Sequence, residues 1–336
     1  MAEDKVPASN SERMLSEAIT AYVLFSEPVD FTLGEIAGAL AEDYPALQGW
    51  KSMLDGAMDD RLINTDDAPL GALTRDGGEM LLFSGTKGPF PGPLGDDIGP
   101  AVRNTKGFPD VEQVVANHRS YLSISCDWGK KTDLASRFLA AQMVTCVSAL
   151  FAKLPVCVGV YYWNAEHIVP PDRWVAAAES AAAEEWPLVD WVSFQIVGAP
   201  GTGTLEHNAG CLTRGMSAFN GHEISVTTAP MTPADVVLMA TGAMWQLLAG
   251  GHVFKDGDTT GREGSGEKIK IRYQPEEHPK SLLPVWVLFP ENSPVDHETE
   301  YGQTESVAPP PGMGNEVNSE KGFLSRLLRG RRGGNA

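Results

Sequence analysis

The feature that most constrains the fold is a long apolar stretch from Phe138 to Ala152. Only a few polar residues interrupt it, namely Gln142, Thr145 and Ser148. A membrane-spanning helix needs about 20 such residues, and Lys153 ends this stretch too early. The residues that follow, V-C-V-G-V-Y-Y-W, are mostly β-branched or aromatic, as in a strand. The pattern therefore predicts a buried helix that runs into a buried strand.

The first third of the chain alternates strand and helix signals. The apolar run A-Y-V-L-F at 21–25 predicts a strand, and Thr32 with Glu35 has the spacing of a capping box at a helix start. Residues 79–85 predict a second strand. Residues 121–127, Y-L-S-I-S-C-D, alternate apolar and polar, which indicates a third. This β-α-β-α-β order is compatible with a split β-α-β arrangement.

The second part adds further strands at 156–162, 268–273 and 283–289. A well-defined helix begins at T-P-A-D, 232–235, because threonine suits a cap and proline suits the first turn. One apolar stripe follows along that helix: Val236, Val237, Ala240, Ala243, Met244, Leu247 and Leu248. We predict an α+β fold with mixed or antiparallel sheets and packed helices.

Composition predicts four regions along the chain. Residues 1–14 form a polar, disordered N-terminus, and residues 15–290 form an α+β globular region. That region is either one domain or two subdomains, 15–130 and 131–290. Residues 291–318 form a disordered acidic linker containing proline and glycine, and residues 319–336 form a basic amphipathic peptide.

The charge balance excludes one class of partner. The chain has 336 residues and a formal net charge of −18, whereas a general nucleic-acid binder needs a basic surface. Its cysteines are widely spaced and form no zinc or redox motif, as expected in a reducing compartment. The N-terminus lacks the apolar stretch of a secretory signal, so we predict a cytoplasmic protein. No cofactor and no metal site are predicted.

Residues 256–267, D-G-D-T-T-G-R-E-G-S-G-E, nearly match a calcium-binding loop. Asp256, Asp258, Thr260 and Glu267 stand where that loop places oxygen ligands, and Gly261 stands at its sharp turn. The helix that should follow is replaced by K-I-K-I-R-Y, whose alternation indicates a strand. A polar connection between two strands is therefore favoured over a weak calcium-binding module.

The other candidate for chemistry lies at the end of the 156–162 strand. Tyr161, Trp163, Asn164 and His167 form the best candidate pocket, although core aromatic residues explain the pattern equally well. An enzyme would have to assemble its site from dispersed residues near 161–167 and 256–267. The segment G-M-S-A-F at 215–219 departs from a nucleophile elbow because Phe219 replaces the second glycine.

The C-terminal peptide carries an apolar face that so short a segment cannot bury by itself. The face consists of Phe323, Leu324, Leu327 and Leu328, and the basic residues around it include Arg326, Arg329, Arg331 and Arg332. An anionic membrane surface, a groove on a protein partner, or the acidic body could cover this face; the alternative is a disordered end that only adds solubility. A protein docked in this way would be cytoplasmic or peripheral at the inner face of the membrane.

Several phrases occur in the same order as in a known family. They are V-G-V-Y-Y-W-N, T-R-G-M-S-A-F-N-G-H-E-I-S-V, and K-D-G-D-T-T-G followed by E-K-I-K-I-R-Y. With them the chain resembles the uncharacterised bacterial family called domain of unknown function 4261, over about residues 20–290. It departs from that pattern at Tyr121 and at Asn220-Gly221. The resemblance implies a shared fold but no known reaction.

These observations favour a non-catalytic interaction protein that docks to a partner or a membrane through residues 319–336. A dispersed-site enzyme and a weak calcium-binding module remain the alternatives.

Overall fold

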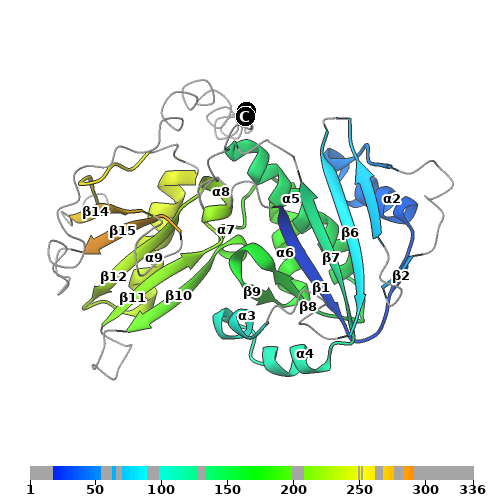
Figure 1. Ribbon diagram of the computed structural model, residues 1–336, viewed down its shortest axis with the longest axis horizontal. Coiled ribbons are helices and arrows are strands. Elements are labelled where there is room, and N and C mark those ends of the chain that lie inside the picture. The colour runs from blue at the N-terminus through cyan, green and yellow to red at the C-terminus, as the bar shows by residue number, and fades with distance from the viewer. Residues whose placement is uncertain are drawn as a thin grey trace, which may run out of the picture. The chain divides into compact units, whose positions relative to one another are not determined.

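The computed structural model describes residues 18–53, 63–65, 70–76, 78–88, 98–127, 133–198, 208–248, 250, 253–261, 268–275 and 283–290. The predicted N-terminal region 1–14, the linker 291–318 and the peptide 319–336 lie outside them. The chain divides into two compact units (Figure 1). The first comprises Met1–Ser193 with Arg214–Asn220, and the second comprises Phe194–Thr213 with Gly221–Ala336.

The first unit is built on a seven-stranded sheet within the described residues, in the order β3-β5-β6-β7-β1-β8-β9. Its strands are β1 (Ile19–Phe25), β3 (Lys51–Ser52), β5 (Leu70–Thr74), β6 (Met80–Lys87), β7 (Ser120–Asp127), β8 (Cys157–Tyr162) and β9 (His167–Val169). Strand β1 pairs antiparallel with both neighbours, so that Val23 lies opposite Leu122 and Val160. Strand β7 lies between β1 and β6 and is antiparallel to both, so β1 and β6 run in the same direction on either side of it, as the predicted split β-α-β arrangement requires. A small sheet joins β2 (Asp30–Phe31) to β4 (Ile63–Asn64).

Helix α5 (Leu134–Ala152) is the core helix of this unit, as the apolar stretch predicted. It lies against β1, β7 and β8 on one side and contacts α2 (Leu33–Asp43) and α6 (Pro171–Ala182) on others. Among the described residues, this is the one helix long and apolar enough to cross a membrane, but 78% of its most apolar window is buried inside the protein. A helix that is apolar all round and covered in this way is a core helix.

The polar residues of α5 have partners on the neighbouring helices. Gln142 donates from Nε2 to the carbonyl oxygen of Ala181 at 2.7 Å. The Thr145 hydroxyl accepts from the indole N–H of Trp191 at 2.9 Å, and the Ser148 hydroxyl accepts from that of Trp174 at 2.8 Å. Because a buried polar group costs free energy unless it is hydrogen-bonded, these bonds select how α6 and α7 (Leu188–Trp191) pack on α5.

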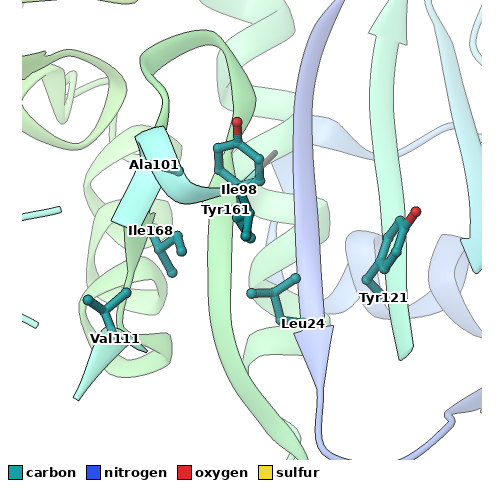
Figure 2. Packing of buried hydrophobic residues seen from close by; sticks show 7 residues of the cluster. All are labelled: Leu24, Ile98, Ala101, Val111, Tyr121, Tyr161 and Ile168. Atoms are coloured by element: carbon teal, nitrogen blue, oxygen red, sulfur yellow. The ribbon is translucent and has the colours of Figure 1, made fainter. Parts of the chain in front are cut away.

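The opposite face of the sheet is partly covered by short helices, α3 (Gly99–Asn104) and α4 (Val111–Asn117). Figure 2 shows the cluster that forms there, with side chains from β1, β7, β8, β9 and the two helices. Its buried members are Leu24, Ile98, Ala101, Val111, Tyr121, Tyr161 and Ile168. Short 3-10 helices at Pro45–Leu47 and Trp163–Ala165 complete the elements of this unit outside residues 214–220.

The second unit contains a six-stranded mixed sheet within its described part, in the order β10-β11-β12-β15-β14-β13. The strands are β10 (Ser193–Gly198), β11 (Ala209–Arg214), β12 (Glu223–Ala229), β13 (Thr259–Thr260), β14 (Ile269–Gln274) and β15 (Val285–Pro290). Strands β12 and β15 run parallel, whereas the pairs β11–β12, β13–β14 and β14–β15 are antiparallel. Helix α9 (Pro233–Leu248) lies against β12, and Thr232 caps it by accepting from the Asp235 N–H at 3.2 Å. The predicted α+β class with mixed and antiparallel sheets is confirmed.

Residues 214–220 return from the second unit to the first. Helix α8 (Ser217–Asn220) contacts α5, where the Phe219 ring lies 5.2 Å from that of Phe138. Gly215 precedes it with a φ of 101°, and a Cβ there would lie 2.6 Å from the Trp191 carbonyl oxygen. The first unit thus extends to Ser193, because α5 is buried on the first sheet.

The capping box predicted at the start of α2 is present. The Thr32 hydroxyl accepts from the Glu35 N–H at 3.0 Å, and the Glu35 carboxylate accepts from the Thr32 N–H at 2.7 Å. Replacing Thr32→Ala should lower the free energy of unfolding by about 1 kcal/mol in urea denaturation. Thr32→Ser keeps the hydroxyl and should stay close to wild type. Equal losses in both variants would contradict the capping role.

Candidate functional site

A groove of about 570 Å³ runs beside helix α9 in the second unit. Its lining combines α9, the β13 end of the sheet and the strands next to it: Met231, Asp235, Leu238, Met239, Gly242, Ala243, Gln246, Thr260, Gly261, Ile269 and Leu288. Asp235 is the one acidic or basic residue of this lining, and it lies near the N-terminal end of α9. Toward the other end, the Thr260 hydroxyl donates to Gln246 Oε1 at 3.2 Å. The arrangement suits an apolar ligand surface with a positive charge at one end.

The groove is open because a glycine lies in the middle of it. A Cβ built on Gly242 would meet no atom within 4 Å, so neither packing nor backbone strain requires glycine there. An exposed helix-interior glycine costs roughly 1 kcal/mol relative to alanine. Leu238 and Trp245 add apolar surface on the outer side of α9, with 57% and 43% of their surface exposed.

The groove was not predicted from the sequence. The residue pattern predicts one apolar stripe along the helix, and Val236, Ala240 and Met244 of that stripe are buried. The signal that remained was a second apolar pair, Leu238 and Trp245, spaced seven residues apart and so on one side of a helix. A helix with an apolar inner face and further apolar residues outside has more apolar surface than its own sheet covers.

The described half of the calcium-like loop uses its acids as hydrogen-bond acceptors for the edge of the sheet. Asp256 accepts from the Tyr273 backbone N–H at 2.9 Å through Oδ1 and lies 3.3 Å from Arg272 Nη1 through Oδ2. Asp258 accepts from the Lys255 N–H at 2.9 Å. Residues 262–267, including Glu267, lie outside the described part of the chain. These contacts give the two aspartates a structural role, because each accepts hydrogen bonds that stabilise the edge of the sheet.

Tyr161 and Trp163 of the candidate pocket do lie together. Their ring centroids are 5.8 Å apart, and both pack against the cluster of Figure 2, in which Tyr161 is buried. Tyr22 joins them, with its ring 5.7 Å from that of Tyr161. The contacts are those of aromatic residues in a core.

Asn164 and His167 have separate structural contacts. Asn164 Oδ1 accepts from the Thr20 backbone N–H at 2.9 Å and so supports the start of β1. His167 lies directly opposite Tyr162, one residue out of phase with Tyr161, which places it on the other face of the sheet. Its Nε2 lies 2.8 Å from the carbonyl oxygen of Asp190. The structure therefore brings together Tyr161 and Trp163 but separates them from His167.

Burial shifts the acid–base groups of the first unit away from catalytic values. Burial lowers the pKa of His167 to about 4, with a smaller opposing contribution from its bond to the Asp190 carbonyl. Burial also raises the pKa of the Asp190 carboxyl, against the nearby Arg173 at 2.6 Å. A general base works best with a pKa near the working pH, and an imidazole that stays neutral inside the core is not exposed to a substrate.

The cysteines and Ser217, the candidate nucleophiles considered from the sequence, are buried as well. The free cysteines all lie in the interior, and burial raises the pKa of Cys146, Cys157 and Cys211 to about 12. Ser217 of the G-M-S-A-F segment is 1% exposed in α8. Within the described ranges, no group of three or more His, Cys, Asp or Glu side chains is placed to hold a metal ion. The C-terminal residues Phe323 to Arg332 lie outside those ranges.

Asp256 tests the structural account of the loop. Asp256→Ala should lower the free energy of unfolding by about 1–3 kcal/mol, because the Tyr273 N–H loses its acceptor. Asp256→Asn keeps an oxygen for that N–H and should lose less than about 1 kcal/mol, since the contact to Arg272 is partly exposed. Urea denaturation measures both. Millimolar calcium should leave the wild-type unfolding midpoint unchanged, and a rise would favour the calcium-binding alternative.

His167 predicts a pH dependence of stability. Its pKa is about 4 in the folded chain and about 6.5 in an unfolded one, so only the unfolded chain takes up the proton between these values. Above pH 6.5 the neutral His167 makes its full contribution to the free energy of unfolding. As the pH falls from 6.5 toward 4, this contribution decreases by about 3 kcal/mol. Unfolding free energies of wild type and His167→Gln, measured from pH 7 to pH 4, should converge by about that amount. Parallel curves would contradict the shift.

Comparison with known families bears on the second unit. Residues 212–287 match the model of a family described as Domain of unknown function (DUF4261). No curated protein and no solved structure matches the chain. The matched segment contains every residue that lines the groove except Leu288. The predicted resemblance, which extended over about residues 20–290, is thus confirmed for residues 212–287, the segment that matches this family model.

Proposed function

We propose that the chain is a non-catalytic interaction protein that docks through residues 319–336 to an anionic surface, either a membrane or an acidic protein. The observation that carries the proposal is the C-terminal peptide itself. It combines an apolar face with five basic residues and no acid between Lys321 and Ala336. Such a peptide gains from apolar burial and from attraction to anionic groups at the same time.

The described side chains support a binding role over catalysis. The acids of the 256–261 loop contact backbone N–H groups and Arg272, and the described cysteines are buried. His167 has a backbone partner and a lowered pKa in the core. These groups have stabilising roles in the fold, whereas the apolar face of the peptide has no such role within so short a segment.

The charge of the rest of the chain favours contact through the peptide alone. Residues 1–320 sum to −23, since the whole chain is −18 and the last segment contributes +5. An anionic surface repels such a body. A connection with the composition of residues 291–318 spans about 30 Å, well beyond the Debye length of about 8 Å at physiological salt. The peptide can then reach the anionic surface while the acidic body stays beyond the range of the electrostatic repulsion from that surface.

Vesicle flotation tests the proposal with the full chain. Binding to vesicles of phosphatidylserine and phosphatidylcholine should fall at least about tenfold in the Phe323→Ser/Leu327→Ser variant, because two large apolar side chains are lost. Arg329→Gln/Arg332→Gln should weaken binding and reduce its salt dependence. Vesicles of phosphatidylcholine alone are the control for charge.

A parallel capture experiment separates the two anionic surfaces. Full-length protein and the Phe323→Ser/Leu327→Ser variant are immobilised and exposed to the same lysate. Capture of an acidic protein by the wild type but not by the variant, without vesicle binding, would assign the peptide to a protein partner. Equal behaviour of wild type and variant in both experiments would overturn the proposal.

A further inference from the structure

We infer that the groove beside α9 holds the chain's own C-terminal peptide, residues 319–336, when that peptide is not docked elsewhere. The inference rests on the proposed function, because it regulates the same peptide. In this inference the groove, defined by its lining residues above, competes with the anionic surface for binding of the peptide. Three independent features of the second unit support it: where the chain leaves the sheet, the shape of the groove, and its charge.

The chain leaves the described structure next to the groove. Leu288 of β15 lines it, and β15 ends two residues later at Pro290. Pro290 lies opposite Ile269 of β14, which is also a lining residue. The connection to the C-terminal peptide therefore starts at the wall of the site that the peptide is proposed to occupy.

The length of the connection fits that start. Phe323 follows Pro290 by 33 residues (323 − 290), and a coil of that length spans about 30 Å. The α9 side of the groove extends from Asp235 to Gln246, which is about 16 Å at the helical rise. Both ends are within reach. Binding within one chain takes place at an effective concentration of order millimolar, so even weak contacts fill the groove.

The groove and the peptide have matching surfaces. Leu238, Met239, Ile269 and Leu288 provide apolar contacts, and the missing side chain of Gly242 leaves room between them. Methionine adapts readily to the shape of an apolar ligand. The peptide presents its apolar residues as i, i+1, i+4 and i+5, which form one face in a helical conformation: Phe323, Leu324, Leu327 and Leu328.

Charge favours this occupant over a second copy of the acidic body. Asp235 is the ionisable member of the lining, and its carboxylate accepts from the Thr232 hydroxyl at 2.7 Å. Its negative charge at one end of the groove attracts the arginines of the peptide. The same four apolar side chains cannot contact the groove and a membrane together. Occupancy of the groove therefore weakens docking by the fraction of peptide that is held.

Disulfide trapping in the full chain tests the contact. Leu238→Cys and Leu327→Cys place one thiol at the groove and one on the peptide. The natural cysteines are all buried, which limits competing reactions. Under mild oxidation with copper–phenanthroline, the pair should form an intramolecular bond at least about tenfold faster than Val197→Cys with Leu327→Cys. Val197 is the matched control, because it is 46% exposed on β10 at the opposite edge of the same sheet.

A groove-filling substitution supplies the second readout. Gly242→Phe points a ring into the open space, and in the Leu238→Cys/Leu327→Cys chain it should slow trapping to the control rate. Gly38→Phe is its control, because Gly38 also lies in a helix with no atom within 4 Å of an added Cβ. It should leave trapping unchanged. Thermal unfolding of both variants checks that the fold is intact.

The outcomes separate this inference from the proposed function. Trapping at the Val197 rate, a bond that joins two chains, or insensitivity to Gly242→Phe would each overturn the inference, even if tail-dependent docking persists. Fast trapping in a chain that binds neither vesicles nor a protein partner would support the inference and overturn the proposed function. If both hold, Gly242→Phe alone should tighten binding to phosphatidylserine vesicles by at least about tenfold, since the peptide is released.

Discussion

The structure depends on the burial of a helix that is apolar on every side. Helix α5 has no face suited to water, so the fold must supply cover all around it. The sheet covers one side, and α2, α6 and α8 contact it from others. Its few polar residues bond to the Trp174 and Trp191 indoles and to a carbonyl of α6. A buried polar group needs a partner. These hydrogen bonds therefore fix the orientation of the neighbouring helices on α5, which apolar contact alone would not specify.

That requirement also explains why the chain crosses between its units. Residues 214–220 belong by contact to the first unit, although the residues on both sides belong to the second. Phe219 lies beside Phe138 and Trp191 there, and Arg137 of α5 donates to the Ala218 carbonyl oxygen. The segment that resembled a nucleophile elbow is thus part of the cover of α5, and Ser217 is buried with it.

The second unit differs because the described residues cover its helix α9 on one side only. Its inner face packs on the sheet, whereas Leu238 and Trp245 remain exposed beside a groove that Gly242 keeps open. A helix interior would be more stable with alanine at that position. Strand β15 ends at the wall of this groove, and the basic peptide follows further along the chain. The same peptide is therefore proposed both to dock to an anionic surface and to be regulated by binding to the groove.

Some of this was readable from residue order alone. The apolar run predicted α5, the capping box predicted the start of α2, and T-P-A-D predicted that of α9, because these signals involve neighbours in the chain. The alternation of K-I-K-I-R-Y likewise predicted strand β14, which excluded the helix of a calcium-binding hand. The antiparallel partners of β1 and the membership of residues 214–220 were not predictable in this way, since both depend on contacts between distant segments.

The candidate site shows the same division. Sequence alone determined the apolar face and the charge of residues 319–336, because both follow from side-chain type and helical spacing. Only the tertiary structure decided that Tyr161 and His167 face opposite sides of a sheet, that Asp256 is an acceptor for the Tyr273 N–H, and that α9 borders a groove. The physical reason is that a side chain's chemistry is set by what surrounds it, and those neighbours come from segments far away in the chain.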